Sequence, residues 1–230
     1  MFYSFSKPGR YHREADIENQ DRICIRRCGG LVCAAVADGW GGSDLSQYGA
    51  EGASRAAAEY IITHFRRLFG RTSADALRYE VVTAVWAELD RLAAELGTCR
   101  EMLASTLLVL CCDTADGRYL SLHIGDGLAA RRDGDGLCLL SAPVNGITRQ
   151  YATLTDSPRS LAAARVHRGY APGSAFLLMT DGCTGELWDG AEFHGPAAQY
   201  LSDGDWVGFE GFVREKDPGD DHSFVALGGR

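Results

Sequence analysis

The chain has 230 residues, of which 46% are hydrophobic and 23% are charged, and its net charge is −8. This composition is typical of a soluble globular protein, and the length fits one domain spanning residues 1–230. The negative charge and the scattered basic residues argue against nucleic-acid binding. No stretch approaches the roughly 18 consecutive apolar residues of a membrane-spanning helix, and the N-terminus has no apolar signal segment, so we expect no membrane association.

The eight cysteines are expected to be reduced thiols. There is no C-x-x-C pair, and Cys24 and Cys28 lack the second pair that would complete a zinc tetrahedron. Most of the others lie in apolar runs, where a free cysteine behaves as a small hydrophobic residue. Thiols of this kind indicate a cytoplasmic protein.

The first elements expected along the chain are two strands followed by two long helices. The apolar runs at 22–27 and 31–37 predict strands joined by a glycine turn. From Gln47 to about Phe69 the apolar residues recur at intervals of three and four, which predicts an amphipathic helix. A second helix is expected from the N-cap candidate Ser73 to Gly97.

The rest of the chain is predicted to be mainly strands. Residues 142–160 are polar and irregular, and residues 182–216 are glycine-rich and only weakly helical in pattern. Grouped helices and hairpin-linked strands favour an α+β fold with largely antiparallel sheets. The expected strands are 105–112, 118–124, 127–133, 137–141, 164–170, 174–180 and 222–228.

Aspartates stand at the ends of the strongest strands. A single Asp-Gly pair usually marks a turn. Recurrence at strand ends favours another interpretation, because packed strands can bring their ends together in one cleft. Crowded carboxylates repel one another unless cations neutralise them, and hard oxygen ligands suit magnesium or manganese. The aspartates concerned are Asp21, Asp38, Asp126, Asp181 and the pair Asp220-Asp221.

Six short motifs resemble those of the metal-dependent serine/threonine protein phosphatases of the protein phosphatase 2C family. They stand in the family's order and span residues 9 to 228. The motifs are N-Q-D (19–21), V-A-D-G-W-G-G (36–42), S-T-L-L-V (105–109), H-I-G-D-G (123–127), L-L-M-T-D-G (177–182) and D-D-H-S-F-V (220–225). The resemblance implies a four-layer α-β-β-α sandwich, in which two mainly antiparallel sheets are flanked by helices.

The resemblance also implies a metal centre that holds two Mg or Mn ions and a third, more labile one. Asp38 would bridge two ions and be central to catalysis, and Gly39 would offer its backbone carbonyl. Asp181 and Asp220 would hold the second ion. Asp21 would act through bound water, and Asp126 would help to bind the third ion. Asp220 is preferred to Asp221 as a ligand, because Asp221 falls where the family usually has asparagine.

The N-terminal region departs from the common family pattern. Many members carry an arginine shortly before the N-E-D motif to grip the phosphate, and here Asp16 stands in that region. His12 lies eight residues before Gln20, as in a bacterial subgroup of the family. His12 is therefore the candidate for phosphate contact and catalysis, with Arg13 and Arg10 behind it. The alternative is a surface histidine in a polar N-terminal strand.

Trp40 stands where some relatives have the histidine proposed as general acid, so water could protonate the leaving group instead. His123 is interpreted as a packing residue, because lone histidines on strands usually make structural hydrogen bonds. Residues 142–160 correspond to the variable flap and substrate region of the family, and contain Arg149, Tyr151 and Arg159.

The function implied by the resemblance is hydrolysis of phosphoserine and phosphothreonine in protein substrates by a metal-activated water, without a covalent enzyme intermediate. The alternative is a catalytically weak or inactive relative that serves as a regulatory or binding module. A hydrolase with a nucleophilic side chain is disfavoured, because the chain has no G-x-S-x-G motif. The oligomeric state has no signal in the sequence.

Overall fold

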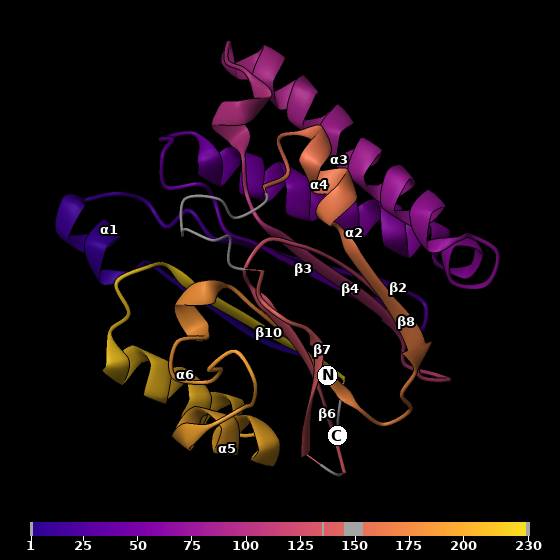
Figure 1. The fold of residues 1–230 in the computed structure, drawn as a ribbon, viewed down its shortest axis with the longest axis vertical. Coiled ribbons are helices and arrows are strands. Elements are labelled where there is room, and N and C mark those ends of the chain that lie inside the picture. Colours follow the sequence, from indigo (N-terminus) through magenta and orange to yellow (C-terminus); the bar gives the residue numbers. More distant parts are fainter. Residues whose placement is uncertain (1, 135, 145–153, 229–230) are drawn as a thin grey trace.

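The protein is described by a computed structural model that covers residues 2–134, 136–144 and 154–228 (Figure 1). Within these residues the strands form two five-stranded sheets, and neighbouring strands in each sheet are antiparallel. Sheet I has the order β1 (Phe2–Lys7), β10 (His222–Gly228), β9 (Ala175–Met179), β6 (Leu128–Asp133) and β7 (Gly136–Ser141). Sheet II has the order β2 (Arg22–Cys28), β3 (Leu31–Ala37), β4 (Leu107–Asp113), β5 (Arg118–Ile124) and β8 (Arg165–Tyr170).

Helices cover the outer faces of both sheets. Figure 1 shows α2 (Ser46–Gly70), α3 (Ala74–Leu96) and α4 (Pro158–Ala163) on the side of sheet II. On the opposite side, α5 (Gly195–Asp203) and α6 (Trp206–Lys216) lie against sheet I. A short helix, α1 (Arg10–Ala15), follows β1, and two 3₁₀ turns, η1 (Arg100–Leu103) and η3 (Asp181–Cys183), complete the elements used below.

The core consists of three apolar layers that separate the four layers of backbone. Side chains of β9 alternate between them: Leu177 and Met179 pack with the α5 and α6 residues, whereas Phe176 and Leu178 pack between the sheets. A strand buried on both faces needs a continuous apolar sequence, which explains runs such as LVCAAVA. The third layer lies between sheet II and helices α2 and α3. The predicted four-layer α+β sandwich is confirmed.

The two long helices begin and end where the sequence predicted. The Ser73 hydroxyl accepts a hydrogen bond from the Ala76 amide at 3.2 Å and so caps α3. Gly97 ends this helix in the left-handed conformation, with φ of +66°. Three helices were less visible in the sequence: α4 begins inside the segment 142–160 that was expected to be irregular and ends at Ala163, and α5 and α6 lie inside the weakly helical segment 182–216.

His12 does not lie in an N-terminal strand, which was the alternative considered for it. The N-terminal strand β1 ends at Lys7, and His12 lies in α1. Two residues of the expected flap region, Arg149 and Tyr151, lie outside the described residues. Arg159 lies within α4.

The antiparallel topology brings distant strand ends to one edge of each sheet. β2 begins beside the end of β3, and β5 runs parallel to β3 because both are antiparallel to β4, which lies between them. In sheet I, β10 begins beside the end of β9. The aspartates that follow β3, β5 and β9, and those that precede β2 and β10, therefore collect at corresponding edges.

The eight cysteines, all of which lie in the described residues, form no disulfide, as predicted. In the part of the chain that the structure describes, no helix combines the length and the apolar character needed to cross a membrane.

Candidate metal centre

The strand-end aspartates surround one pocket of about 180 Å³. They come from four separate segments of the chain, which meet because of the topology described above. Four of the predicted ligands contribute side chains, and a fifth residue, Gly39, contributes backbone. The described residues that line the pocket are His12, Gln20, Asp38, Gly39, Trp40, Gly41, Thr106, Asp126, Leu154, Asp181 and Asp220.

The segment Asp38-Gly39 is held by neighbouring backbone on both sides. Thr106 exchanges two hydrogen bonds with Asp38: its hydroxyl accepts from the Asp38 amide at 3.0 Å, and its amide donates to the Asp38 carbonyl at 2.8 Å. The Gly39 amide donates to the Gln20 carbonyl at 3.2 Å. A Cβ atom at position 39 would lie 2.8 Å from Ser46 Oγ, so glycine is needed for this close approach. The segment is extended, with Gly39 in an isolated antiparallel bridge to Ser105, and it forms one wall of the pocket.

Asp21 lies behind the pocket and is 1% exposed. Its carboxylate accepts a hydrogen bond from the Thr180 hydroxyl at 2.8 Å. Burial and the nearby carboxylates of Asp221 and Asp181 raise the pKa of Asp21 to about 8. Asp21 is not among the lining residues, and its role through bound water stays a prediction.

The remaining carboxylates also disfavour one another's charge. Burial raises the pKa of Asp38 well above its usual range, and the charges of Asp21 and Asp181 raise it further. Burial likewise raises the pKa of Asp126, with a contribution from Asp220. A site in which ionised carboxylates repel is relieved by protons or by cations.

The donor set fits a divalent cation in its chemistry. Carboxylate and carbonyl oxygens are the ligands that magnesium and manganese prefer. Two buried oxygens, Gln20 Oε1 and Asp21 Oδ1, accept no hydrogen bond from the described residues. The geometry is open, since within the described residues no three Asp, Glu, His or Cys side chains stand close enough together to hold an ion as they are. Coordination would require these side chains to draw together.

His12 is anchored by the second aspartate of the D-D pair. His12 Nδ1 lies 2.8 Å from a carboxylate oxygen of Asp221, which is 1% exposed. The same carboxylate accepts hydrogen bonds from the amides of Gly9, at 2.7 Å, and Gln20, at 2.6 Å. With Nδ1 engaged, Nε2 is the ring nitrogen left for a ligand in the pocket. Asp220 is exposed and lines the pocket, so the two adjacent aspartates do different work.

The arginines near His12 are placed differently. The guanidinium of Arg13 donates to the Pro8 carbonyl at 2.7 Å and pairs with Asp217, and Arg13 is not among the lining residues. The guanidinium of Arg10 lies over the ring of Tyr11, 5.4 Å from its centroid. Neither arginine contributes to the pocket lining.

His123 lies away from the pocket lining, in keeping with its interpretation as a packing residue. It is 1% exposed, its Nδ1 lies 2.8 Å from Ser141 Oγ, and the guanidinium of Arg165 lies against the ring at 2.9 Å. Arg165 also donates to Gly125, the residue before Asp126. These contacts support the loop that carries Asp126.

Some residues of the site received no role from the sequence. Gln20, Thr106 and Asp221 all lie within quoted motifs, so the signal that could have identified them was present. What the motifs do not state is which neighbour each polar atom contacts, because those contacts depend on the packing of distant segments.

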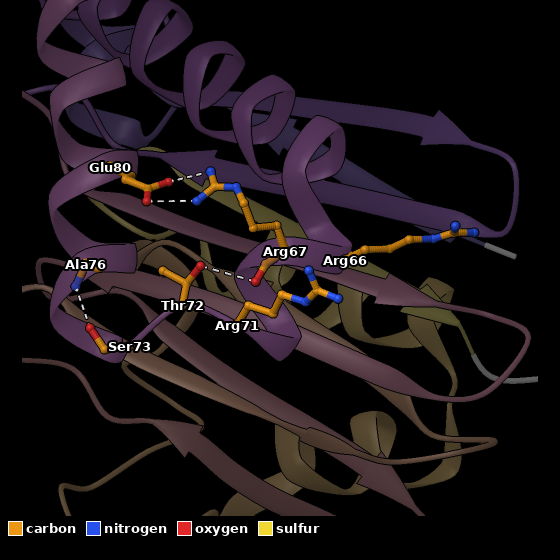
Figure 2. Close-up of a pocket in the computed structure, with 7 residues that line it drawn as sticks. All are labelled: Arg66, Arg67, Arg71, Thr72, Ser73, Ala76 and Glu80. Carbon is orange, nitrogen blue, oxygen red and sulfur yellow. Dashed lines mark hydrogen bonds and ion pairs between the residues drawn. The ribbon is translucent and has the colours of Figure 1, made fainter.

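A larger pocket of about 820 Å³ lies where α2 ends and α3 begins. Figure 2 shows three arginines there, Arg66, Arg67 and Arg71, with Arg67 bonded to both carboxylate oxygens of Glu80 at 2.9 and 2.6 Å. These residues stand at the carboxyl end of α2, where positive charge is favourable. Arg168 caps the same end through the carbonyls of residues 68, 69 and 72. The arrangement is explained by helix termination, and Glu80 is the only acidic residue among the described residues that line this pocket.

The comparisons with known proteins agree with this fold. The family model for protein phosphatase 2C matches residues 8–206. The chain therefore belongs to the protein phosphatase 2C family, whose members are metal-dependent phosphatases. A search of curated proteins finds no significant match.

Several solved structures share the fold at low sequence identity. A bacterial serine phosphatase is 13% identical with a TM-score of 0.70, covering 100% of this chain and 98% of its own. PppA, a regulatory component of T6SS in Pseudomonas aeruginosa, is 18% identical with a TM-score of 0.68, covering 99% and 97%. RsbX in complex with magnesium is 14% identical with a TM-score of 0.61, covering 98% and 92%. At these identities the similarity establishes the fold alone.

Proposed function

We propose that this protein is a metal-dependent serine/threonine protein phosphatase, acting on phosphoserine and phosphothreonine in protein substrates in the cytoplasm. The observation that carries the proposal is the convergence of Asp38, Asp126, Asp181 and Asp220 on one pocket that also contains His12. Family membership supports phosphatase chemistry, and the mutually raised pKa values of the buried carboxylates support cation binding.

The residues of the pocket have distinct roles in this proposal. Asp38, the Gly39 carbonyl, Asp181 and Asp220 would hold two Mg or Mn ions, Asp21 would act through bound water, and Asp126 would help to hold a third ion. When bound, such ions polarise the phosphoryl group and lower the pKa of a water enough to make it a nucleophile.

His12 would contact a phosphate oxygen through Nε2, with its ring oriented by Asp221. Arg13 is kept as a more distant substrate-binding candidate, which would have to leave Asp217 to reach a phosphate. The indole N–H of Trp40 is too weak an acid to protonate the leaving group, so water would supply that proton.

The alternative function is a regulatory or binding module with weak or no turnover. The open geometry of the carboxylates favours this alternative. The retention of four acids around one pocket favours the enzyme. Clustered carboxylates repel one another and so destabilise the folded protein, and a binding module that needs only the fold would have no reason to keep them.

Hydrolysis of p-nitrophenyl phosphate separates the two functions. We expect manganese-dependent turnover that chelator abolishes, and a loss of about two orders of magnitude or more in kcat/KM for Asp38→Ala. Asp44→Ala is the matched control, since Asp44 is an exposed aspartate of the same loop outside the pocket lining. Absent turnover, or turnover that chelator and Asp38→Ala leave unchanged, would establish the module instead.

A further inference from the structure

A large aromatic side chain stands at the mouth of the acidic pocket. Trp40 is 45% exposed and lines the pocket directly after Asp38 and Gly39. Leu154 is the other large apolar side chain among the described lining residues. Single exposed apolar residues are common on protein surfaces, so exposure alone assigns no role to Trp40.

The position of Trp40 is fixed more firmly than that of an ordinary surface residue. Its amide donates to the Ala104 carbonyl at 2.9 Å, and its carbonyl accepts from the Ser43 amide at 3.1 Å. Both backbone groups of Trp40 are therefore anchored, and the start of its side chain cannot drift from the pocket.

The indole ring lies against Gly42. A Cβ atom at position 42 would overlap the six-membered part of the ring and would lie 2.7 Å from its Cη2 atom. The backbone of Gly42 does not adopt a positive φ, so an alanine here would displace the ring of Trp40 and would not strain the backbone. In the D-G-W-G-G sequence, Gly42 thus leaves room for the ring of Trp40 to pack against the backbone beside the pocket.

The indole ring of Trp40 has an exposed surface and a hydrogen-bond donor that a ligand could contact. Among the described residues, Trp40 Nε1 has no hydrogen-bond partner, in contrast to the indole nitrogen of Trp86, which donates to the Thr155 carbonyl at 2.8 Å. An aromatic ring held in a fixed orientation loses little conformational entropy on binding, and it buries a large apolar area.

We propose that Trp40 and Leu154 form a subsite for an apolar side chain adjacent to the phosphorylated residue of a protein substrate. The proposal rests on the proposed function and makes it more specific. A substrate whose phosphate occupies the acidic pocket places its neighbouring residues at the pocket mouth, where the two apolar side chains stand. Leu154 favours an apolar occupant over a cationic one, because an aliphatic side chain makes apolar contacts but has no polar atom that could bind a charged group.

Three phosphoserine peptides test the subsite, and they differ only in the residue flanking the phosphoserine, which is leucine, serine or arginine. With leucine in place of serine at that position, we expect kcat/KM of the wild type to rise about tenfold. In Trp40→Ala the ratio of leucine to serine peptide should fall to about one, whatever the absolute rates. Trp40→Phe should keep most of the ratio, because it keeps an aromatic ring.

Tyr79→Ala is the matched control, since Tyr79 is 58% exposed on α3 and does not line the pocket. It should keep the wild-type ratio. Gly42→Ala retains Trp40 but fills the space in which its ring packs, so the ratio of leucine to serine peptide should fall although the indole is present. Thermal melting verifies that each variant is folded. A ratio near one in the wild type, a ratio unchanged in Trp40→Ala, or a preference for the arginine peptide over the leucine peptide would overturn the proposal.

Fluorescence anisotropy with the same peptides, labelled and mixed with manganese, separates this proposal from the proposed function. Tighter binding of the leucine peptide by the wild type but not by Trp40→Ala would support the subsite even without turnover. Turnover of p-nitrophenyl phosphate without any preference among the peptides would overturn the subsite and leave the phosphatase proposal intact.

Discussion

The adjacent residues Asp220 and Asp221 show how position decides the role of a side chain. Asp221 is buried and accepts three hydrogen bonds, from His12 and from two backbone amides. Asparagine, which the family usually has at this position, offers one acceptor atom and would put an amide group near these donors. The carboxylate of Asp221 therefore fits a chain that places a histidine against it.

The pH dependence of stability should depend on His123. Burial lowers the pKa of His123 well below its usual value, and the charge of Arg165 lowers it further. The unfolded chain then binds a proton that the folded protein rejects, so this contribution to stability is present above about pH 6.5 and is lost as the pH falls.

We therefore expect the free energy of unfolding in urea to fall more steeply below pH 6.5 in the wild type than in His123→Gln. The difference in slope should approach about 1.4 kcal/mol per pH unit. Parallel profiles for the two proteins from pH 7.5 to pH 5 would contradict it.

At the scale of elements, helix α2 depends on two glycines that let it approach its neighbours. A Cβ atom at Gly49 would overlap the carbonyl oxygen of Leu103 in η1, and one at Gly52 would overlap Leu92 of α3. The first turn of the same helix contacts the pocket, because Ser46 at the start of α2 lies against Gly39.

Two alanine substitutions in α2 should have opposite effects. Gly49→Ala forces backbone atoms apart, so we expect a loss of about 2–3 kcal/mol in unfolding free energy. Gly70→Ala places its methyl group in open space, so we expect no change or a gain of up to about 1 kcal/mol from helix propensity. Chemical denaturation measures both, and equal effects of the two substitutions would refute the close contact.

The sequence was most informative about elements whose pattern is local. Helix α3 has a regular apolar period, a serine N-cap and a terminal glycine, and its bounds were predicted closely. An N-terminal strand was considered only as the alternative setting for His12. The bounds of β1 were not predicted, because six residues of mixed polarity become a strand only by pairing with β10, more than two hundred residues away. Helix α5 was obscured by surrounding glycines, which lower the intrinsic helix signal.

The same distinction applies to the site. The strand-end aspartates were predicted to converge because a motif order and an antiparallel fold together specify one edge. The contact between His12 and Asp221 was not predicted, since nothing local in either segment indicates the other. The displacement of Arg13 toward Asp217 has the same origin, because that partner also comes from the C-terminal region.

For the whole molecule, metal binding should couple to global stability. A ligand that binds only the folded protein stabilises it by about 2.7 kcal/mol at 100 times its Kd, which corresponds to roughly 5–10 °C in Tm for a chain of this size. We expect magnesium or manganese to raise Tm by an amount of this order, and Asp181→Asn to remove most of the rise.

Asp44→Asn, which changes an exposed aspartate outside the pocket lining, should retain the rise in Tm. A melting curve that stays the same across millimolar manganese would count against the proposed metal centre. This measurement requires no turnover, so it applies equally to an enzyme and to a binding module.

The three hydrogen bonds of Asp221 span 201 to 212 residues of chain. Closing loops of such length is entropically costly and slow, whereas the hairpin of α2 and α3 needs only neighbouring residues. During folding, the helical layer can assemble while the N-terminal histidine and the C-terminal aspartates are still far apart. We therefore expect the pocket to be among the last parts of the molecule to form, so that a partly folded chain with native-like helix content would still lack the assembled pocket.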